Sequence, residues 1–145
     1  MRNPRPTGFS RRMRLLRPAD FARVYDTRQS AAAGPVVLYA AVNRADPASV
    51  RIGLSVSRRI GSAVVRNRWK RRLREAFRMV RGELPAGNDF VIVVRSGEAP
   101  AGAAGAREIE STIASLARRV VGRRGYAAAV PAPRERPAAK PKRSR

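Results

Sequence analysis

The sequence contains no cysteine and no histidine. Without cysteine the chain forms neither a disulfide framework nor a thiolate metal site. Without histidine it lacks the commonest general base and the commonest metal ligand. Acidic residues are also scarce, with 10 Asp and Glu in 145 residues, and no two of them stand four residues apart. A two-metal nuclease needs carboxylates that bridge ions about 4 Å apart, and the sequence has no local motif of that kind.

A long apolar segment is absent as well. No apolar run approaches the roughly 20 residues that a membrane-spanning helix needs. The N-terminal segment 1–14 is basic, but no apolar core typical of a signal peptide follows it. We therefore expect a cytoplasmic protein that does not span a membrane.

Arginine is strongly enriched. The chain has 32 Lys and Arg, giving a formal net charge of +22, and lysine occurs only at Lys70, Lys140 and Lys142. Like charges at this density disfavour a compact state unless a polyanion neutralises them. Arginine pairs with phosphates through a planar fork and stacks on bases with its flat face. The composition therefore indicates nucleic acid or an anionic membrane as the partner.

The length of the chain fits one folded domain with flanking tails. Residues 1–13 are a basic arm that contains proline and glycine, and residues 14–122 contain the regular apolar patterns. Residues 123–145 are rich in alanine, proline, arginine and lysine. This composition does not bury an apolar core, so we expect the tail to be disordered on its own.

Apolar patterns predict the elements of the first half. Pro18 and Asp20 favour the start of a short helix over about residues 19–28. Residues 36–43 are rich in β-branched and aromatic side chains and predict a strand. Residues Val50–Val56 alternate between apolar and small or polar side chains, which predicts a half-buried strand with a small, polar second face.

A long helix, a strand and another helix follow. Residues 62–81 have a helical apolar stripe, and Ser62 is the expected N-cap. Residues 90–94 are a continuous apolar run, which suits a strand covered on both faces. We expect residues 98–105 to be a linker and residues 108–121 to be a helix.

These elements predict an α/β (α+β) two-layer sandwich of the kind found in ribosomal proteins. The expected order is α-β-β-(β)-α-β-α, where the bracketed strand has no assigned residues. The sheet is small and mixed, and the long basic helix crosses over between two of its strands.

The long helix separates apolar and cationic residues. Trp69 lies within the apolar stripe, so we expect it in the core, whereas Arg66 lies at the edge of the stripe. Phosphates repeat along an RNA strand, so cations spaced three and four residues apart meet several of them at once. The arc opposite the stripe contains Asn67, Lys70, Arg71, Arg74 and Arg78.

The second strand and the long helix together contain an ordered motif. Residues 53–57 read GLSVS, residues 58–61 read RRIG, residues 66–68 read RNR and residues 70–74 read KRRLR. This order closely resembles the signature of the bacterial ribonuclease P protein family. The resemblance covers about residues 14–121.

The resemblance implies a role for each part of the motif. In that family the arginine-asparagine-arginine helix mainly contacts a catalytic RNA, and a cleft between the first helix and the sheet holds the single-stranded 5′ leader of precursor tRNA. The expected catalytic-RNA contacts are Arg58, Arg59, Arg66, Asn67, Arg68, Lys70, Arg71, Arg72 and Arg74. The expected leader contacts are Phe21, Tyr25, Tyr39, Arg51, Ser55 and Ser57. Tyr25 departs from the phenylalanine of many members, which keeps a stacking ring and adds a hydroxyl.

The implied function is that of a ribonuclease P subunit, which promotes endonucleolytic removal of the leader to form the mature tRNA 5′ end. Catalysis would belong to the RNA and its bound magnesium. We therefore expect no catalytic residue, metal site or cofactor in the protein. The expected partners are precursor tRNA and the ribonuclease P RNA, with one protein per RNA, and neither a membrane nor a small-molecule substrate.

Plainer interpretations apply to the same residues. A run of charges is usually a solvated helix face, and Arg66 is placed to cover Trp69 with its apolar stem. Phe21 and Tyr25, at helical spacing, are by pattern more often core residues than a platform for bases. Gly53 is either an ordinary strand glycine or a point of close RNA approach.

Other functions also fit the composition. A structural RNA-binding protein of the ribosomal type would bind RNA and leave precursor cleavage unchanged. A DNA-binding module would place the basic helix in a major groove, but the sequence has no helix-turn-helix pairing or dimerisation element. A membrane-active helix fits less well, because residues 65–80 have the apolar face of a helix inside a folded domain.

Overall fold

The computed structural model describes residues 11–129. A 3₁₀ turn at Arg11–Met13 precedes the first helix, and a second one at Arg58–Ile60 precedes the longest basic helix. The remaining elements are α1 (Pro18–Asp26), β1 (Ser30–Ala33), β2 (Val36–Val42), β3 (Val50–Val56), α2 (Ala63–Val80), β4 (Asn88–Val94) and α3 (Gly102–Val121), with a 3₁₀ turn at Arg81–Glu83 after α2.

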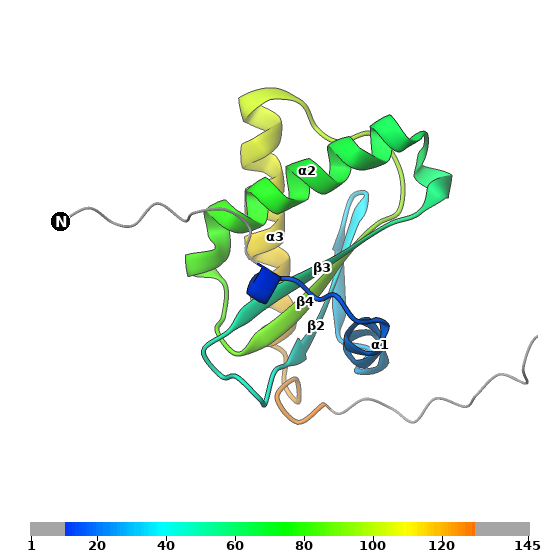
Figure 1. The fold of residues 1–145 in the computed structure, drawn as a ribbon. Coiled ribbons are helices and arrows are strands. Elements are labelled where there is room, and N and C mark those ends of the chain that lie inside the picture. Colours follow the sequence, from blue (N-terminus) through cyan, green and yellow to red (C-terminus); the bar gives the residue numbers. More distant parts are fainter. Residues whose placement is uncertain (1–10, 130–145) are drawn as a thin grey trace, which may run out of the picture.

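The four strands form one mixed sheet in the order β1-β2-β4-β3. β1 and β2 are an antiparallel hairpin, and β2 is also antiparallel to β4. β3 and β4 are parallel neighbours, so α2 crosses over between them (Figure 1). The predicted fold class is therefore confirmed. The bracketed strand was expected after residues 50–56, but the additional strand is β1, which precedes β2.

Helices cover both faces of the sheet. α2 and α3 pack on one face, and α1 lies on the other (Figure 1). Because successive residues of a strand point to opposite faces, Leu38 and Ile92 enter the core under α2 and α3. Ala41 and Val91 instead pack with Val24 of α1. The predicted two-layer arrangement describes the sheet with α2 and α3, and α1 covers the second face.

The main core forms around the apolar stripe of α2. Trp69, Leu73 and Phe77 are fully buried, which confirms the core assignment of Trp69, and its indole Nε1 donates a hydrogen bond to Gly97 O at 3.0 Å. Ser62 is the N-cap, as predicted, because its Oγ accepts from the backbone N–H of Val65. The stripe thus fixes the rotation of α2 and leaves its cations on the other side.

Two predicted boundaries are wrong. Arg28 adopts a left-handed φ of 56°, which a helix does not accommodate, so α1 ends at Asp26. The predicted linker 98–105 is helical from Gly102 onwards, because alanine is the strongest helix former and outweighs the glycines of this stretch. Gly105 is needed there for space, since a Cβ on it would lie 2.5 Å from the carbonyl carbon of Pro100.

The predicted tail also needs correction at one residue. Tyr126 is 3% exposed and belongs to the main core, and its hydroxyl donates a 2.6 Å hydrogen bond to Asn88 Oδ1. The folded part therefore extends past residue 122. The arm at residues 1–10 and the tail at residues 130–145 lie outside the described residues. Within residues 11–129, no helix has both the length and the apolar character to cross a membrane.

Candidate RNA-binding surfaces

Three aromatic rings lie between α1 and the sheet. Tyr25 of α1 and Tyr39 of β2 have ring centroids 5.0 Å apart and planes at 86°, the favourable edge-to-face arrangement. Phe21, one turn before Tyr25, packs over Gly53 of β3. All three rings are half-buried, so each packs against the protein and also presents a face or edge to solvent.

Gly53 provides the space for Phe21. A Cβ at this position would lie 2.6 Å from Phe21 Cζ and 3.2 Å from Leu15 Cβ. The Phe21 ring thus fills the space beside Gly53 into which, on one interpretation of the sequence, an RNA backbone would enter. The small residue serves to seat an aromatic ring beside the strand.

The two predicted serines occupy different places. Ser55 of β3 forms a hydrogen bond with Tyr25; burial raises the pKa of that phenol, and this bond lowers it in part. Ser57 lies beyond the end of β3 and is exposed. Its Oγ accepts a 3.2 Å hydrogen bond from the Arg59 N–H, so it caps the turn on which the exposed Arg58 and Arg59 stand.

Arg51 is engaged in an ion pair. Its Nε and Nη2 donate to the carboxylate oxygens of Asp89 at 2.9 and 2.7 Å, and Asp20 lies 4.0 Å from Nη2. Hydrogen bonding to Asp89 is the largest cause that raises the pKa of Arg51. The side chain is 27% exposed, so it reaches the surface from a fixed position.

Asp89 is a site residue that sequence reasoning missed. It is fully buried, and Arg23 of α1 contacts it as well while donating to Val42 O at 3.1 Å. Asn43 adds a 3.4 Å hydrogen bond to the carboxylate. The available signal was an acid at the start of an apolar strand, because a buried charge needs partners. The sequence did not reveal which arginines supply them.

The cations of α2 point in different directions. Arg66 is half-buried, and its Nε lacks a hydrogen-bond partner among the described residues. Arg71 lies 3.7 Å from Glu75, an exposed pair that contributes little to stability. Arg68 and Arg72 line a pocket towards the start of α3. Among the predicted contacts of α2, the exposed positions are Asn67, Arg68, Arg71 and Arg74, and the half-buried ones are Arg66, Lys70 and Arg72.

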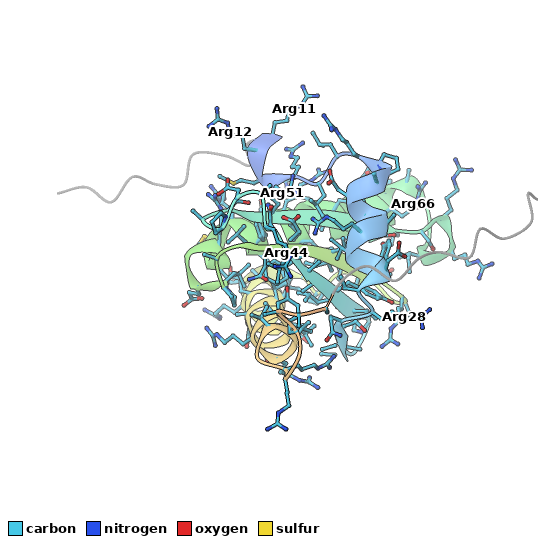
Figure 2. The ribbon with its side chains drawn as sticks, turned by 90° about the horizontal axis from the view of Figure 1, so that it is seen from below. Arg11, Arg12, Arg28, Arg44, Arg51 and Arg66 are labelled. Atoms are coloured by element: carbon cyan, nitrogen blue, oxygen red, sulfur yellow. The ribbon has the colours of Figure 1, made fainter. Side chains whose placement is uncertain are left out.

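Positive charge also surrounds α1. Figure 2 shows Arg11 and Arg12 in the first 3₁₀ turn, Arg28 after α1 and Arg44 in the β2–β3 loop. All four arginines are exposed, and Arg44 lines a pocket together with Arg23 and Arg51 on the α1 side of the sheet. Among residues 11–129, no three His, Cys, Asp or Glu residues lie together in a group that could hold a metal ion.

Comparisons with known proteins agree on one family. The model of the family Ribonuclease P matches residues 9–121. The ribonuclease P protein component of Brevibacillus brevis is 44% identical over 84 residues, which are 58% of this chain and 66% of that protein. The protein of the same name from Bacillus cereus strain B4264 is 38% identical over 87 residues, or 60% of this chain and 75% of that protein.

Solved structures show the same fold. The Staphylococcus aureus RNase P protein superimposes with a TM-score of 0.57 at 30% identity, covering 72% of this chain and 91% of that one. The RNase P protein from Thermotoga maritima gives a TM-score of 0.55 at 27% identity, covering 77% and 98%. The family match spans more than half of the chain and includes α1, the sheet, α2 and α3. The chain therefore belongs to the bacterial ribonuclease P protein family.

Proposed function

We propose that this chain is the protein subunit of ribonuclease P, that it binds the catalytic RNA and the 5′ leader of precursor tRNA, and that it promotes removal of the leader. One observation supports this most directly. In a chain of this family, the RNR helix presents exposed cations, and the opposite face of the sheet presents half-buried aromatic rings. The function places the protein in the cytoplasm, with one copy per catalytic RNA.

The catalytic RNA binds α2 in this proposal. Its apolar stripe is buried against the sheet and α3, so the helix is held rigidly while its other side faces solvent. Arg68, Arg71 and Arg74 are exposed and spaced three residues apart, which lets one backbone meet several guanidinium groups. Arg58 and Arg59, at the end of β3, extend the same surface.

The leader binds on the α1 side of the sheet. Aromatic rings stack on unpaired bases without reading their sequence, and Phe21, Tyr25 and Tyr39 provide three rings within one group. Ser55 adds a hydroxyl, and Arg51 adds a positive charge that Asp89 holds in place. This surface suits a single strand of variable sequence.

The chemistry in this proposal belongs to the RNA. A catalytic RNA with bound magnesium supplies the cleavage step, and the residues of this chain bind and orient the two RNAs. Neutralising the phosphates near the cleavage site lets the complex form at a lower magnesium concentration. The protein therefore acts through binding energy and electrostatics.

Cleavage of a 5′-extended precursor tRNA at low, near-physiological magnesium tests the proposal. The assay compares the protein alone, a bacterial ribonuclease P RNA alone, and the two together. Efficient cutting at the mature 5′ end by the mixture only is the expected result. If the protein alone cuts, the catalytic group lies in the protein. If the mixture cuts no better than the RNA, the structural RNA-binding alternative holds.

A further inference from the structure

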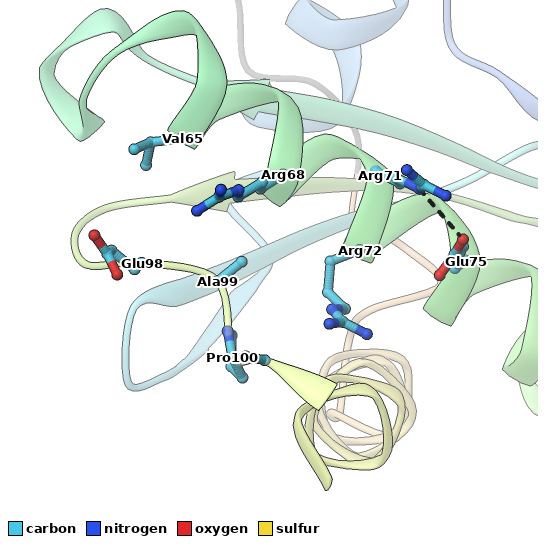
Figure 3. Close-up of a pocket in the computed structure, with 9 residues that line it drawn as sticks. Val65, Arg68, Arg71, Arg72, Glu75, Glu98, Ala99 and Pro100 are labelled. Atoms are coloured by element: carbon cyan, nitrogen blue, oxygen red, sulfur yellow. Dashed lines mark ion pairs between the residues drawn. The ribbon is translucent and has the colours of Figure 1, made fainter. Parts of the chain in front are cut away.

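A pocket lies between α2 and the segment that leads into α3 (Figure 3). Its volume is about 470 Å³, within the range of roughly 300–1,000 Å³ that is usual for small-ligand sites. Arg68 and Arg72 extend from α2 towards the side of Ala99 and Pro100. The pocket thus joins two segments that are far apart in the sequence.

The pocket combines cations with an apolar floor. Val65 and Ala99 line it and pack against the main core, so their positions are fixed. Within residues 11–129, no carboxylate lies within ion-pair distance of Arg68 or Arg72, although Glu98 and Glu75 also line the pocket. Two guanidinium groups are therefore available to an anion directly beside an apolar surface.

The start of α3 completes one wall. Ala101 lines the pocket and is the N-cap of α3, and it has no side chain that could accept the first backbone N–H groups. The first turn of a helix leaves such groups unpaired and favours negative charge. They add to the attraction of Arg68 and Arg72 for an anion.

The ligand chemistry follows from this combination. A nucleotide has a flat apolar base and an anionic phosphate separated by a sugar, which matches an apolar floor beside two arginines. Arg74, by contrast, is exposed and does not line the pocket. An RNA backbone that binds the exposed Arg71 and Arg74 along α2 therefore runs past the mouth of this pocket, which lies on the side of α2 that faces α3.

We propose that this pocket holds one unpaired nucleotide of the catalytic RNA, with its base against Val65, Ala99 and Pro100 and its phosphate on Arg68 and Arg72. The inference rests on the proposed function and makes it more specific. In this proposal, part of the α2 surface does more than attract phosphates: it recognises one unpaired nucleotide of the RNA.

The test uses full-length protein bound to a bacterial ribonuclease P RNA. Ala101→Trp fills the pocket without changing the net charge, and Arg72→Ala removes one of its cations. The matched controls are Ala103→Trp, an exposed α3 alanine outside the pocket, and Arg118→Ala, an exposed α3 cation distant in sequence from it. Affinity for the RNA is measured over a salt series, and 2′-hydroxyl acylation maps the nucleotides that the protein protects.

We expect each pocket variant to bind the RNA roughly tenfold more weakly, about the loss of one charge-assisted contact, and the double variant to bind little worse than either. In both single variants, one short unpaired stretch of the RNA should no longer be protected from 2′-hydroxyl acylation. Both variants should lower the salt slope by about 0.7–0.9, because a filled pocket no longer brings the phosphate to Arg68 and Arg72. The two controls should keep the protection pattern.

Two results would overturn the pocket site alone: wild-type affinity with wild-type protection in Ala101→Trp, or the same losses in Ala103→Trp. Lost protection on precursor tRNA, and not on the catalytic RNA, would overturn the assignment of the ligand. If the wild-type protein fails to bind the catalytic RNA at all, the proposed function fails and the pocket site fails with it. The two failures are therefore distinguishable.

Discussion

Arg51 and Asp89 are direct neighbours across the parallel pair β3–β4, and two hydrogen bonds of 2.9 and 2.7 Å join the guanidinium to the carboxylate. Arg23 of α1 contacts the same carboxylate. One buried acid therefore binds a cation from the neighbouring strand and another from a helix. The arrangement fastens α1 to the sheet and fixes Arg51 on the surface that we propose for the leader.

Replacing that acid should destabilise the domain. Asp89→Asn removes the counter-ion that Arg23 and Arg51 share and leaves Arg51 only Asp20, at 4.0 Å. We expect the free energy of unfolding to fall by about 2–3 kcal/mol, since water partly solvates both arginines. Urea denaturation measures the loss. Glu83→Gln, which removes an exposed acid, is the control and should change little. Identical unfolding curves for Asp89→Asn and wild type would show that the network adds no stability.

Tyr126 should make stability fall at alkaline pH. Burial raises the pKa of its phenol well above the ordinary value, and the charge of Asp89 adds to the increase. In the unfolded chain the phenol ionises near pH 10. The unfolded state therefore loses its proton first as pH rises, and the stability that is fully present below about pH 10 decreases above it.

Tyr126→Phe isolates that effect. Loss of the hydrogen bond to Asn88 should lower the free energy of unfolding by about 1 kcal/mol at neutral pH. Between about pH 9 and 11 the variant should lose less stability than wild type, although Tyr25, whose pKa burial also raises, keeps part of the slope. Urea unfolding at several pH values gives both quantities. An unchanged alkaline slope would mean that Tyr126 ionises as easily in the folded protein.

Gly53→Ala should displace Phe21. The new Cβ would lie 2.6 Å from the tip of the ring, and the ring can turn away more cheaply than the strand can move. We expect a modest loss of stability together with weaker binding of precursor tRNA to the reconstituted enzyme, measured against mature tRNA. Gly82→Ala is the matched control, because a Cβ there meets nothing within 4 Å. Unchanged preference for the precursor would contradict a leader-binding role for the Phe21 ring.

The two proposed RNA surfaces should separate by mutation. Phe21→Ala removes a stacking ring and should weaken binding of precursor roughly tenfold while leaving mature tRNA unchanged. Arg71→Ala should instead weaken assembly with the catalytic RNA and should lower its salt dependence by about 0.7–0.9. Filter binding and precursor cleavage measure these effects. Equal losses for precursor and mature tRNA in Phe21→Ala would rule out the leader assignment.

Most of the fold was predictable because its signals are local. The alternation of Val50–Val56 and the stripe of α2 each identify an element and the face that it buries. β1 was not located, since its SAAA sequence has no apolar alternation and its strand conformation depends on pairing with β2. The start of α3 was missed because glycines at 102 and 105 read as a linker. The burial of Tyr126 was missed because residues 123–145 are mostly alanine, proline, arginine and lysine, a composition that predicts a disordered tail.

The sequence motif indicated which residues form the two proposed RNA-binding surfaces, but it did not give the contacts among them. The family resemblance implied an aromatic group beside the first helix, and the structure brings Phe21, Tyr25 and Tyr39 together on one side of the sheet. It did not predict that Arg51 would be bound by Asp89, because strand register is a tertiary property. Nor did it predict the pocket beside Ala101, which depends on how α2 packs against the segment before α3.

The position of β4 has a consequence for how the chain folds. It is the last strand among residues 11–129, yet it lies between β2 and β3, so the ribosome releases all of α2 before the strand that joins the sheet together. Until β4 emerges, β1 and β2 can pair only with each other, and β3 has no partner strand. The pairing of β3 with β4 spans the intervening helix α2 and is therefore a slow, non-local step. The nascent chain therefore exposes the apolar stripe of its most basic helix until residues 88–94 emerge, a stage at which a truncated product has no complete core.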